Sequence, residues 1–308
     1  MADDPEGFCL LHSRQAQKDK KGVFTEAVKV KLDEEDFDFR GVYFPGPSKR
    51  LFISRKFNKN ADFKRVTFQS SAGFWLANFI RGASFSWATF DGGADFSEAS
   101  FEELVSFHRA TFKRKAYFSW AKFKGPVHFT EATFSDDVYF YGAIFLKKIS
   151  FHGATFQGKA YFGGLRLEEK GERSLEVFSA DFQGLNLGPE ASLIFTDVPL
   201  SRVEFSGTDM RKAEFHNVTW ARRHGRNVVY DEILLHESEK RPIRERYARV
   251  EELYRLLKLN YEKAGDLKNA GDFHFGEMEM HRQANPLQLW YQFYWALSGY
   301  GSIDKYQK

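Results

Sequence analysis

Phenylalanine recurs through the middle of this chain at spacings that alternate between five and six residues without a miss. The residue two positions before nearly every one of them is Ala or a small β-branched residue. The series consists of Phe52, Phe57, Phe63, Phe68, Phe74, Phe79, Phe85, Phe90, Phe96, Phe101, Phe107, Phe112, Phe118, Phe123, Phe129, Phe134, Phe140, Phe145, Phe151, Phe156 and Phe162. Such regularity indicates one structural position that the chain fills repeatedly.

Few backbones can bury a series with this spacing. On an α-helix, steps of five and six residues rotate the side chain by roughly 140° and 240°, so the rings would spread around the axis. Right-handed coiled coils also repeat every eleven residues, but they need apolar steps of three and four. On a flat strand, each odd step moves the side chain to the opposite face. A chain that turns a corner between successive phenylalanines fits, and this predicts a solenoid whose coils bury their core against each other.

The residue before each phenylalanine sets the length of one coil. From Thr67 onward, every fourth member of this set is threonine, whereas the members eleven residues after each threonine vary in type. The threonines are Thr67, Thr89, Thr111, Thr133 and Thr155, and the residues eleven positions later are Asn78, Ser100, Lys122 and Ile144. The chemistry therefore repeats every 22 residues, which predicts coils with four faces, stacked about 4.8 Å apart. The same period predicts a second column, Tyr117, Tyr139 and Tyr161, preceded by Gly73 and Asp95.

Tandem units such as Ala94-Asp95-Phe96, Ala132-Thr133-Phe134 and Ala213-Glu214-Phe215 resemble the bacterial pentapeptide-repeat family. The resemblance implies a mainly β fold, a right-handed quadrilateral β-helix, in which the apolar residue and the small residue two before it both point inward. The alternation of five and six departs from the strict five of the family. It is similar to the Phe-rich subgroup, and we expect it to make alternate faces slightly longer.

These patterns predict three regions. Residues 1–36 are mixed and charged, and we expect them to cap the N-terminal end, because an open solenoid end exposes unpaired strands. Residues 37–222 form the β-helix, beginning with a partial coil at Phe39 and Phe44 and a loop before Phe52. The charged, Gly-containing segment 163–177 reads as an inserted loop. From Phe195 to Trp220 the apolar residues run at strict fives, so the last coil should narrow.

Residues 223–308 are predicted to be helical. Apolar residues at steps of three and four, from Tyr247 to Tyr261, mark one helix that ends at Gly265. Asp266 should cap a second helix through about Arg282, whose apolar residues are Leu267, Ala270, Phe273 and Met278. A third opens at Pro286 and contains LQLWYQFYWAL. This tail resembles that of bacterial pentapeptide-repeat proteins, many of which continue into channel-like membrane helices. Because the sequence ends seven residues after SGYG, we expect such an extension to have been lost or truncated.

Composition limits where the protein acts and what chemistry it performs. The net charge of +3 creates no strong global field, and a single cysteine excludes an intrachain disulfide. The first residues lack an apolar signal-peptide core, and no apolar stretch is long enough to span a membrane. We therefore expect a cytoplasmic protein, with a location at the periphery of the inner membrane as the alternative.

No catalytic constellation, cofactor motif or complete metal site is apparent in the sequence. Cys9 and His12 form half of a zinc motif, but no second cysteine exists to extend it. Glu277 and His281 lie one helical turn apart, which suits acid–base chemistry but is more typical of a solvated helix face. We expect no enzyme activity, no cofactor and no bound metal.

Aromatic residues provide the candidate binding sites. Tyr117, Tyr139, Tyr161, Trp120 and Tyr141 are expected on or beside one face of the later coils. They form an interaction site if exposed, or packing contacts if the 163–177 loop or the C-terminal helices cover them. The second candidate lies within residues 286–298 and comprises Trp290, Phe293, Tyr294 and Trp295. That helix could pack on the solenoid end, lie at a membrane interface or form a homodimer.

The sequence is compatible with three functions. A protein-binding scaffold follows from the rigid stack and the absence of catalytic motifs. A membrane-associated signalling or channel-related accessory role follows from the resemblance of the tail. DNA mimicry, as in gyrase-binding relatives, would need an acidic surface, yet residues 52–162 contain 15 Lys and Arg against 9 Asp and Glu. This modest basic surplus also disfavours nucleic acid as a partner, so the sequence favours an unidentified protein.

Overall fold

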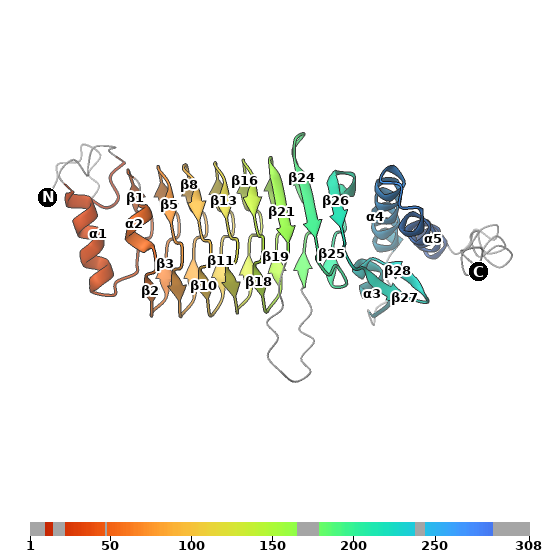
Figure 1. Cartoon of the computed structure of the whole chain (residues 1–308), viewed down its shortest axis with the longest axis horizontal. Helices are drawn as coiled ribbons and strands as arrows, with labels where there is room; N and C mark the ends of the chain where they lie inside the picture. The colour runs from red at the N-terminus through yellow and green to blue at the C-terminus, as the bar shows by residue number, and fades with distance from the viewer. Residues whose placement is uncertain (1–9, 15–21, 47, 165–178, 238–243, 286–308) are drawn as a thin grey trace.

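The chain forms an elongated stack of β-coils with helices at both ends (Figure 1). The computed structural model describes residues 10–14, 22–46, 48–164, 179–237 and 244–285. The stack is a parallel β-solenoid of about seven turns, followed by C-terminal helices, as predicted. It has four faces, each a sheet of short parallel strands.

Each sheet takes one strand from each successive coil. Sheet A contains β3 (Ala61–Asp62), β7 (Ala83–Ser84), β11 (Val105–Ser106), β15 (Val127–His128), β19 (Ile149–Ser150), β22 (Ala180–Asp181) and β25 (Val203–Glu204). Sheet B contains β1 (Tyr43–Phe44), β4 (Thr67–Phe68), β8 (Thr89–Phe90), β12 (Thr111–Phe112), β16 (Thr133–Phe134), β20 (Thr155–Phe156) and β23 (Asn186–Leu187). Sheet C contains β2 (Lys56–Phe57), β6 (Asn78–Phe79), β10 (Ser100–Phe101), β14 (Lys122–Phe123) and β18 (Ile144–Phe145). Sheet D contains β5 (Ala72–Gly73), β9 (Ala94–Asp95), β13 (Ala116–Tyr117), β17 (Val138–Tyr139), β21 (Lys159–Gly163), β24 (Ser192–Thr196) and β26 (Ala213–His216).

The strand register confirms the coil length of 22 residues. Thr67 pairs with Thr89 in sheet B, and Tyr117 pairs with Tyr139 in sheet D. The threonine column begins next to Tyr43 and ends next to Asn186. The register also confirms the shorter last coil, because Leu193 pairs with Ala213, 20 residues later. Both predicted columns are therefore real features of the outer surface.

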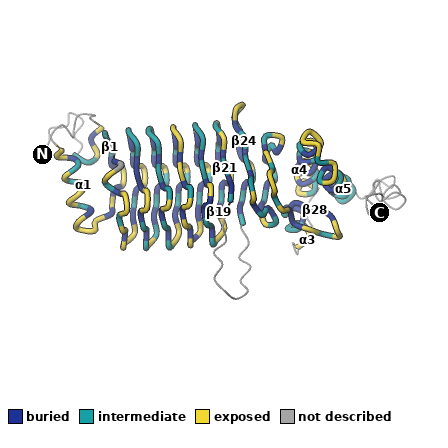
Figure 2. Tube along the Cα trace, viewed as in Figure 1, coloured by how far each residue is buried: buried dark blue, intermediate teal, exposed yellow. Residues whose placement is uncertain are grey.

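The core is a set of stacked phenylalanine rings, buried as predicted. Figure 2 shows that buried residues recur in every coil along the stack. Phe107 illustrates the packing: its ring stacks on Phe85 at 5.0 Å and on Phe129 at 4.7 Å, in the coils on either side. It meets Phe96 and Phe118 edge to face, at 5.3 and 5.5 Å. Offset stacks and edge contacts are the favoured aromatic geometries, so each ring is held from several directions. The alanines and small β-branched residues two positions before the rings are buried as well.

The coils turn at two kinds of corner, which explains the alternating spacing. In the five-residue steps, the second residue after phenylalanine has a positive φ, as at Arg65 (57°), Leu76 (56°) and Trp87 (62°). This left-handed conformation recurs every eleven residues, from Ser54 to Gly164. In the regular coils the strands are two residues long on every face. The extra residue of the six-residue steps therefore lies at a corner, and the expectation of longer alternate faces is wrong.

Helix α1 (Val23–Asp33) covers the N-terminal end of the stack (Figure 1). Its buried side chains are Phe24, Val28 and Leu32, and the ring of Phe24 meets that of Phe44 edge to face at 5.3 Å. The segment before Phe52, predicted to be a loop, ends in the short helix α2 (Lys49–Phe52). Sequence periodicity cannot detect a single helical turn.

The predicted loop 163–177 needs one adjustment at its start. Gly163 is the last residue of β21 and pairs with Thr196 of β24, so the strand continues into the Gly-containing segment. Glycine lowers the confidence of a strand prediction but does not prevent pairing. The remainder of this segment, from residue 165, lies outside the described residues.

The transition to the helical region differs from the prediction. Residues after Trp220 form an antiparallel hairpin, β27 (Ala221–Arg223) and β28 (Arg226–Val228), so the expected boundary at 222 falls within a strand. Helix α3 (Tyr230–Glu237) follows, and the one-turn helix η1 (Met210–Lys212) lies in the last coil. Strands of three residues leave too short a pattern to recognise in sequence.

Two long helices, α4 (Arg244–Lys263) and α5 (Leu267–Ala284), complete the described chain. The apolar stripe of α4 is confirmed, and Asp266 accepts a hydrogen bond from the Asn269 amide at 3.1 Å, as expected of a cap. On α5, Met280 is buried where Met278 was expected, and Leu267 is exposed. The predicted third helix, with Trp290, Phe293, Tyr294 and Trp295, lies outside the described residues. No helix in the described ranges is long and apolar enough to cross a membrane.

Side chains of the helical region replace the backbone partners that a further coil would supply. The Asp231 carboxylate accepts hydrogen bonds from the backbone amides of Phe205, at 3.1 Å, and Ser206, at 2.9 Å. The Asn260 amide donates to the carbonyls of Met210 and Ala213, at 2.8 and 2.7 Å. Burial raises the pKa of Asp231, and the hydrogen bonds from Ser206 and Phe205 partly oppose that rise. These contacts pair part of the open end of the solenoid, which disfavours edge-to-edge association at that point.

Candidate interaction surface

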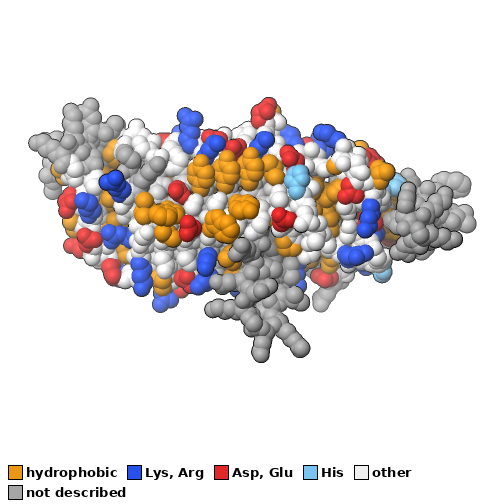
Figure 3. Space-filling view, in the orientation of Figure 1, with side chains coloured by type: hydrophobic (Ala, Val, Ile, Leu, Met, Phe, Trp, Pro, Cys, Tyr) orange, Lys and Arg blue, Asp and Glu red, His pale blue; other side chains and the backbone are white. Residues whose placement is uncertain are grey.

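Three tyrosines form a stacked row on the outside of sheet D. The rings of Tyr117 and Tyr139 lie 5.2 Å apart, and those of Tyr139 and Tyr161 lie 4.9 Å apart. The ring planes are parallel to within 7° and 2°. Because neighbouring rings cover each other's faces, the row presents ring edges and hydroxyl groups to solvent. Figure 3 shows a row of hydrophobic side chains on this face of the molecule.

Charged side chains border the tyrosine row. The Tyr139 hydroxyl donates a hydrogen bond to Asp137 at 3.1 Å, and the Lys115 ammonium lies 5.9 Å from the Tyr139 ring centroid. Burial and the hydrogen bond to Asp137 raise the pKa of Tyr139, so the phenol stays neutral at neutral pH. Contact with Tyr139 raises the pKa of Lys115, which stays cationic. Lys159 is exposed on the same edge of sheet D.

Trp120 and Tyr141 lie at the next corner. Their rings meet edge to face at 5.8 Å, and they are 44% and 55% exposed, which makes them the most accessible aromatic pair of these coils. Trp120 occupies a left-handed corner position with φ 61°. A bulky residue in this conformation is uncommon and indicates local strain that the surrounding fold must support. Together with the tyrosine row they form what we call the aromatic surface: Tyr117, Tyr139, Tyr161, Trp120 and Tyr141.

Two glycines provide the space in which the exposed rings lie. A Cβ atom added to Gly142 would approach the Trp120 ring to 2.6 Å, and one added to Gly163 would approach the Tyr141 ring to 3.0 Å. Each glycine follows its aromatic residue by 22 residues, one coil along the stack. The rings of Trp120 and Tyr141 therefore pack against the glycine backbone of the next coil. Their positions are fixed by the fold and do not depend on a partner.

The described helices do not cover the aromatic surface. Helices α4 and α5 follow the last coil at the C-terminal end of the stack (Figure 1). There Tyr261 of α4 stacks on Phe215 at 5.5 Å and accepts a hydrogen bond from Trp220. Packing of these helices on the aromatic surface, the alternative left open by the sequence, is therefore wrong for α4 and α5. The inserted loop, the other candidate cover, falls among the residues that are not described.

The remaining sequence candidates take part in structural contacts. Glu277 pairs with Lys258 at 2.7 Å, whereas His281 pairs with Glu251 at 2.9 Å, so they are not an acid–base pair. Both contacts join α5 to α4. His12 forms a hydrogen bond with the Arg40 carbonyl at 2.9 Å, and Cys9 lies outside the described residues. Within the described ranges, no cluster of three or more His, Cys, Asp or Glu side chains could hold a metal ion.

We expect Gly142→Ala to displace the Trp120 ring. The new methyl group would overlap the indole, and Ala at φ 66° carries a backbone cost of about 1–2 kcal/mol. Gly184→Ala is the matched control, because Gly184 has φ 63° and open space around its Cβ position. Both variants should lose similar stability in thermal unfolding, but only Gly142→Ala should change tryptophan emission and near-UV dichroism. Identical spectra for the two variants would show that Gly142 does not position Trp120.

Sequence reasoning identified the aromatic residues but missed what holds them. Gly142 and Gly163 could have been found, because each lies one period of 22 residues after Trp120 and Tyr141. Trp75 also extends the aromatic character of this corner, with 40% exposure and a hydrogen bond to Glu98 at 3.3 Å.

Comparison with known proteins identifies the repeats. A family model described as pentapeptide repeats (9 copies) matches residues 56–100 and 96–144. The matched coils include Tyr117, Tyr139, Trp120 and Tyr141 of the aromatic surface. No curated protein and no solved structure matches the chain.

Proposed function

We propose that this chain, a pentapeptide-repeat protein that forms a β-solenoid with C-terminal helices, is a non-enzymatic scaffold that binds a partner protein through its aromatic surface. The observation that carries this proposal is the exposed pair Trp120 and Tyr141, held beside a stacked tyrosine row. An ordered aromatic patch of this kind is uncommon on a surface that has no partner.

The physical chemistry of the patch suits a protein ligand. Tyr and Trp combine a large apolar area with a polar group, and they dominate the energetics of protein interfaces. The rings are already held by stacking and by the space beside Gly142 and Gly163. They therefore lose little conformational freedom on binding, which favours affinity. The tyrosine row presents edges and hydroxyls rather than ring faces, which disfavours ligands that bind by stacking along the row.

The charged side chains beside the tyrosine row indicate the charge that the partner surface should carry. Lys115 and Lys159 border the tyrosine row, so the complementary surface should carry carboxylates beside apolar side chains. Lys115 lies 3.8 Å from Asp137, a weak contact that a better-placed carboxylate can replace. We therefore propose an acidic, partly apolar protein surface as the ligand.

The distribution of acidic groups argues against DNA mimicry. In the central coils, many Asp and Glu side chains pair with Lys or Arg of an adjacent coil. These pairs are Lys113 with Asp91, Arg81 with Glu103, Lys124 with Glu102, and Arg109 with Glu131. Pairing at one-coil intervals neutralises the anionic groups that a mimic of the DNA backbone would need to display. The membrane-associated alternative depends on residues 286–298, which are outside the described part of the chain.

Site-specific photo-crosslinking tests the proposal. A photoreactive residue at position 117 should capture a partner from cells of the source organism, whereas the same residue at position 111, on sheet B, should not. The identified partner should then bind the Trp120→Ala/Tyr141→Ala variant at least about tenfold more weakly, the loss expected for two central aromatic contacts. Thr111→Ala is the matched control and should bind within about twofold of the unmodified protein.

Three results would count against a protein-binding aromatic surface. The first is capture that does not depend on the labelled position. The second is full affinity of the double variant for the identified partner. The third is an adduct that contains only a second copy of this chain, with a dimer in light scattering, which would replace the scaffold by self-association.

A further inference from the structure

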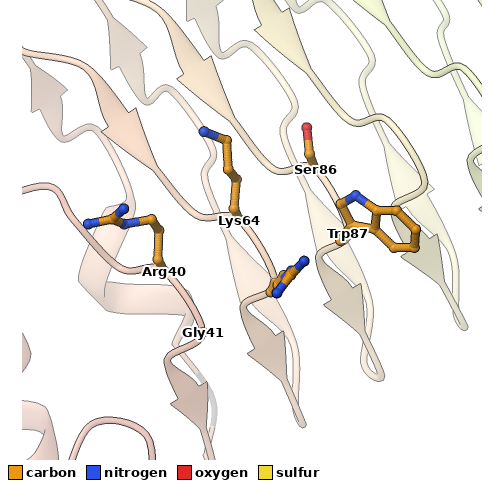
Figure 4. A pocket seen from close by; sticks show the side chains of 6 residues that line it. Arg40, Gly41, Lys64, Ser86 and Trp87 are labelled. Atoms are coloured by element: carbon orange, nitrogen blue, oxygen red, sulfur yellow. The ribbon is translucent and has the colours of Figure 1, made fainter.

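Another exposed tryptophan lies at the opposite corner of the stack, one coil before that of Trp120. Trp87 occupies the corner between sheets A and B with φ 62°, and 48% of its surface is exposed. It lines a pocket of about 520 Å³ together with Arg40, Gly41, Lys64, Arg65 and Ser86. Figure 4 shows the side chains of Arg40, Lys64 and Trp87 on successive coils of the stack. We call this the corner pocket.

Stacking of the coils builds the corner pocket. The amide of Gly41 donates to the Lys64 carbonyl, and the amide of Arg65 donates to the Ser86 carbonyl. Gly41, Arg65 and Trp87 therefore occupy equivalent corner positions in three successive coils. Gly41 has no side chain, and among the described residues His12 lies beside it, with its Cδ2 atom 3.5 Å from a Cβ built on Gly41.

One face of the Trp87 indole is already occupied. The Arg109 guanidinium, from the next coil, lies 4.7 Å from the centroid of the Trp87 ring. Glu131 holds Arg109 in place through an ion pair at 2.6 Å. This cation–π contact holds one face of the indole, while 48% of the Trp87 surface remains exposed. A flat aromatic ligand would find a ring that is positioned in advance.

The pocket walls are cationic. Arg40 pairs with Asp38 at 2.6 Å, and Lys64 pairs with Asp62 at 3.3 Å, but neither carboxylate lines the pocket. Asp38 instead lines a separate depression beside Leu11 and His12. Arg65 is exposed and forms no ion pair with any residue that the structure describes. The pocket thus presents the Arg65 guanidinium, which has no carboxylate partner among the described residues, two cations that pair with Asp38 and Asp62, and part of the Trp87 indole.

We propose that the corner pocket binds a nucleoside phosphate, with the base against the exposed part of the Trp87 indole and the phosphate against Arg65 and Lys64. Proteins that bind single-stranded nucleic acid without sequence preference stack the bases on aromatic side chains next to cationic groups, and the corner pocket offers one such pairing. An inorganic anion would leave the indole unused, and a neutral aromatic ligand would leave Arg65 unused. The volume is that of a small-molecule site rather than an extended nucleic-acid groove. This inference is independent of the aromatic surface on sheet D.

Isothermal titration calorimetry of the full chain with adenosine 5′-monophosphate provides the test. We expect saturable binding that is about tenfold or more tighter than that of adenosine or of inorganic phosphate. Arg65→Glu and Trp87→Ala should each weaken binding by about tenfold or more. Arg114→Glu is the matched control: Arg114 is exposed on a different corner, carries the same charge change and should leave affinity within about twofold. Circular dichroism should show the same melting curve for Arg65→Glu and Arg114→Glu.

The inference is overturned by any of four results. The first is the absence of saturable binding of the monophosphate at low salt. The second is inorganic phosphate binding as tightly as the monophosphate, which would indicate an anion site only. The third is an equal loss in Arg65→Glu and Arg114→Glu, which would indicate diffuse electrostatics. The fourth is an adenine oligonucleotide that binds more tightly than the monophosphate, with an affinity that Arg65→Glu does not change. That result would place the nucleic-acid site elsewhere on the stack.

Discussion

Phe107→Ala should lower the free energy of unfolding by about 3–5 kcal/mol, because it removes a fully buried ring and leaves a cavity in a rigid stack. Phe107 stacks on rings in both neighbouring coils and meets two others edge to face. The coils on either side cannot close the gap, since their strands are hydrogen-bonded at fixed spacing. Urea denaturation followed by circular dichroism measures the loss.

The control for this variant is Ser119→Ala, which alters a half-buried side chain on the outside of the stack. It should change stability by no more than about 0.5 kcal/mol. A loss below about 1 kcal/mol for Phe107→Ala would show that the coils relax around the missing ring.

Glu232→Ala should destabilise the C-terminal region by about 3–5 kcal/mol, the cost of breaking a buried ion pair by removing one partner. Both carboxylate oxygens of Glu232 accept hydrogen bonds from Arg226, at 2.7 and 2.8 Å, and both residues are buried. Burial also raises the pKa of Tyr254 well above its usual value, so its hydroxyl stays protonated and donates to Glu232. Without Glu232, the Arg226 guanidinium would remain buried and uncompensated.

Two further variants separate the charge effect from packing. Arg226→Met/Glu232→Leu should lose less stability than Glu232→Ala, because no unpaired buried charge remains. Glu26→Ala, which removes the exposed pair with Lys29, should cost about 0.5 kcal/mol or less. If the double variant proves less stable than Glu232→Ala, specific hydrogen bonding rather than charge compensation dominates this cluster.

Most of the solenoid could be predicted because the same contacts recur between each coil and the next. The threonines from Thr67 to Thr155 revealed the coil length through a property that every coil shares, namely pairing with the same residue in the next coil. Helix α4 was predictable for a similar reason, since its apolar stripe is long enough to show a period. Repetition supplies many independent observations of one rule.

The parts that escaped prediction occur once and depend on polar contacts. Asp231 and Glu232 look like ordinary solvated residues at the start of a helix, yet both are buried, one as a cap of the last coil and one as a partner of Arg226. The hairpin β27–β28 has strands too short for a pattern. At the candidate sites, the aromatic surface followed from column reasoning. The corner pocket did not, because its cations lie at a corner that carries no apolar period.

The unlike ends of the stack have a consequence for its length. Helix α1 closes one end and the helical region closes the other, while every regular coil between them offers the same partners to the coil before and after it. A whole coil can in principle be added or removed without changing any class of contact. Each coil therefore adds about 4.8 Å to the length of the solenoid, and the number of coils sets the distance between its two capped ends.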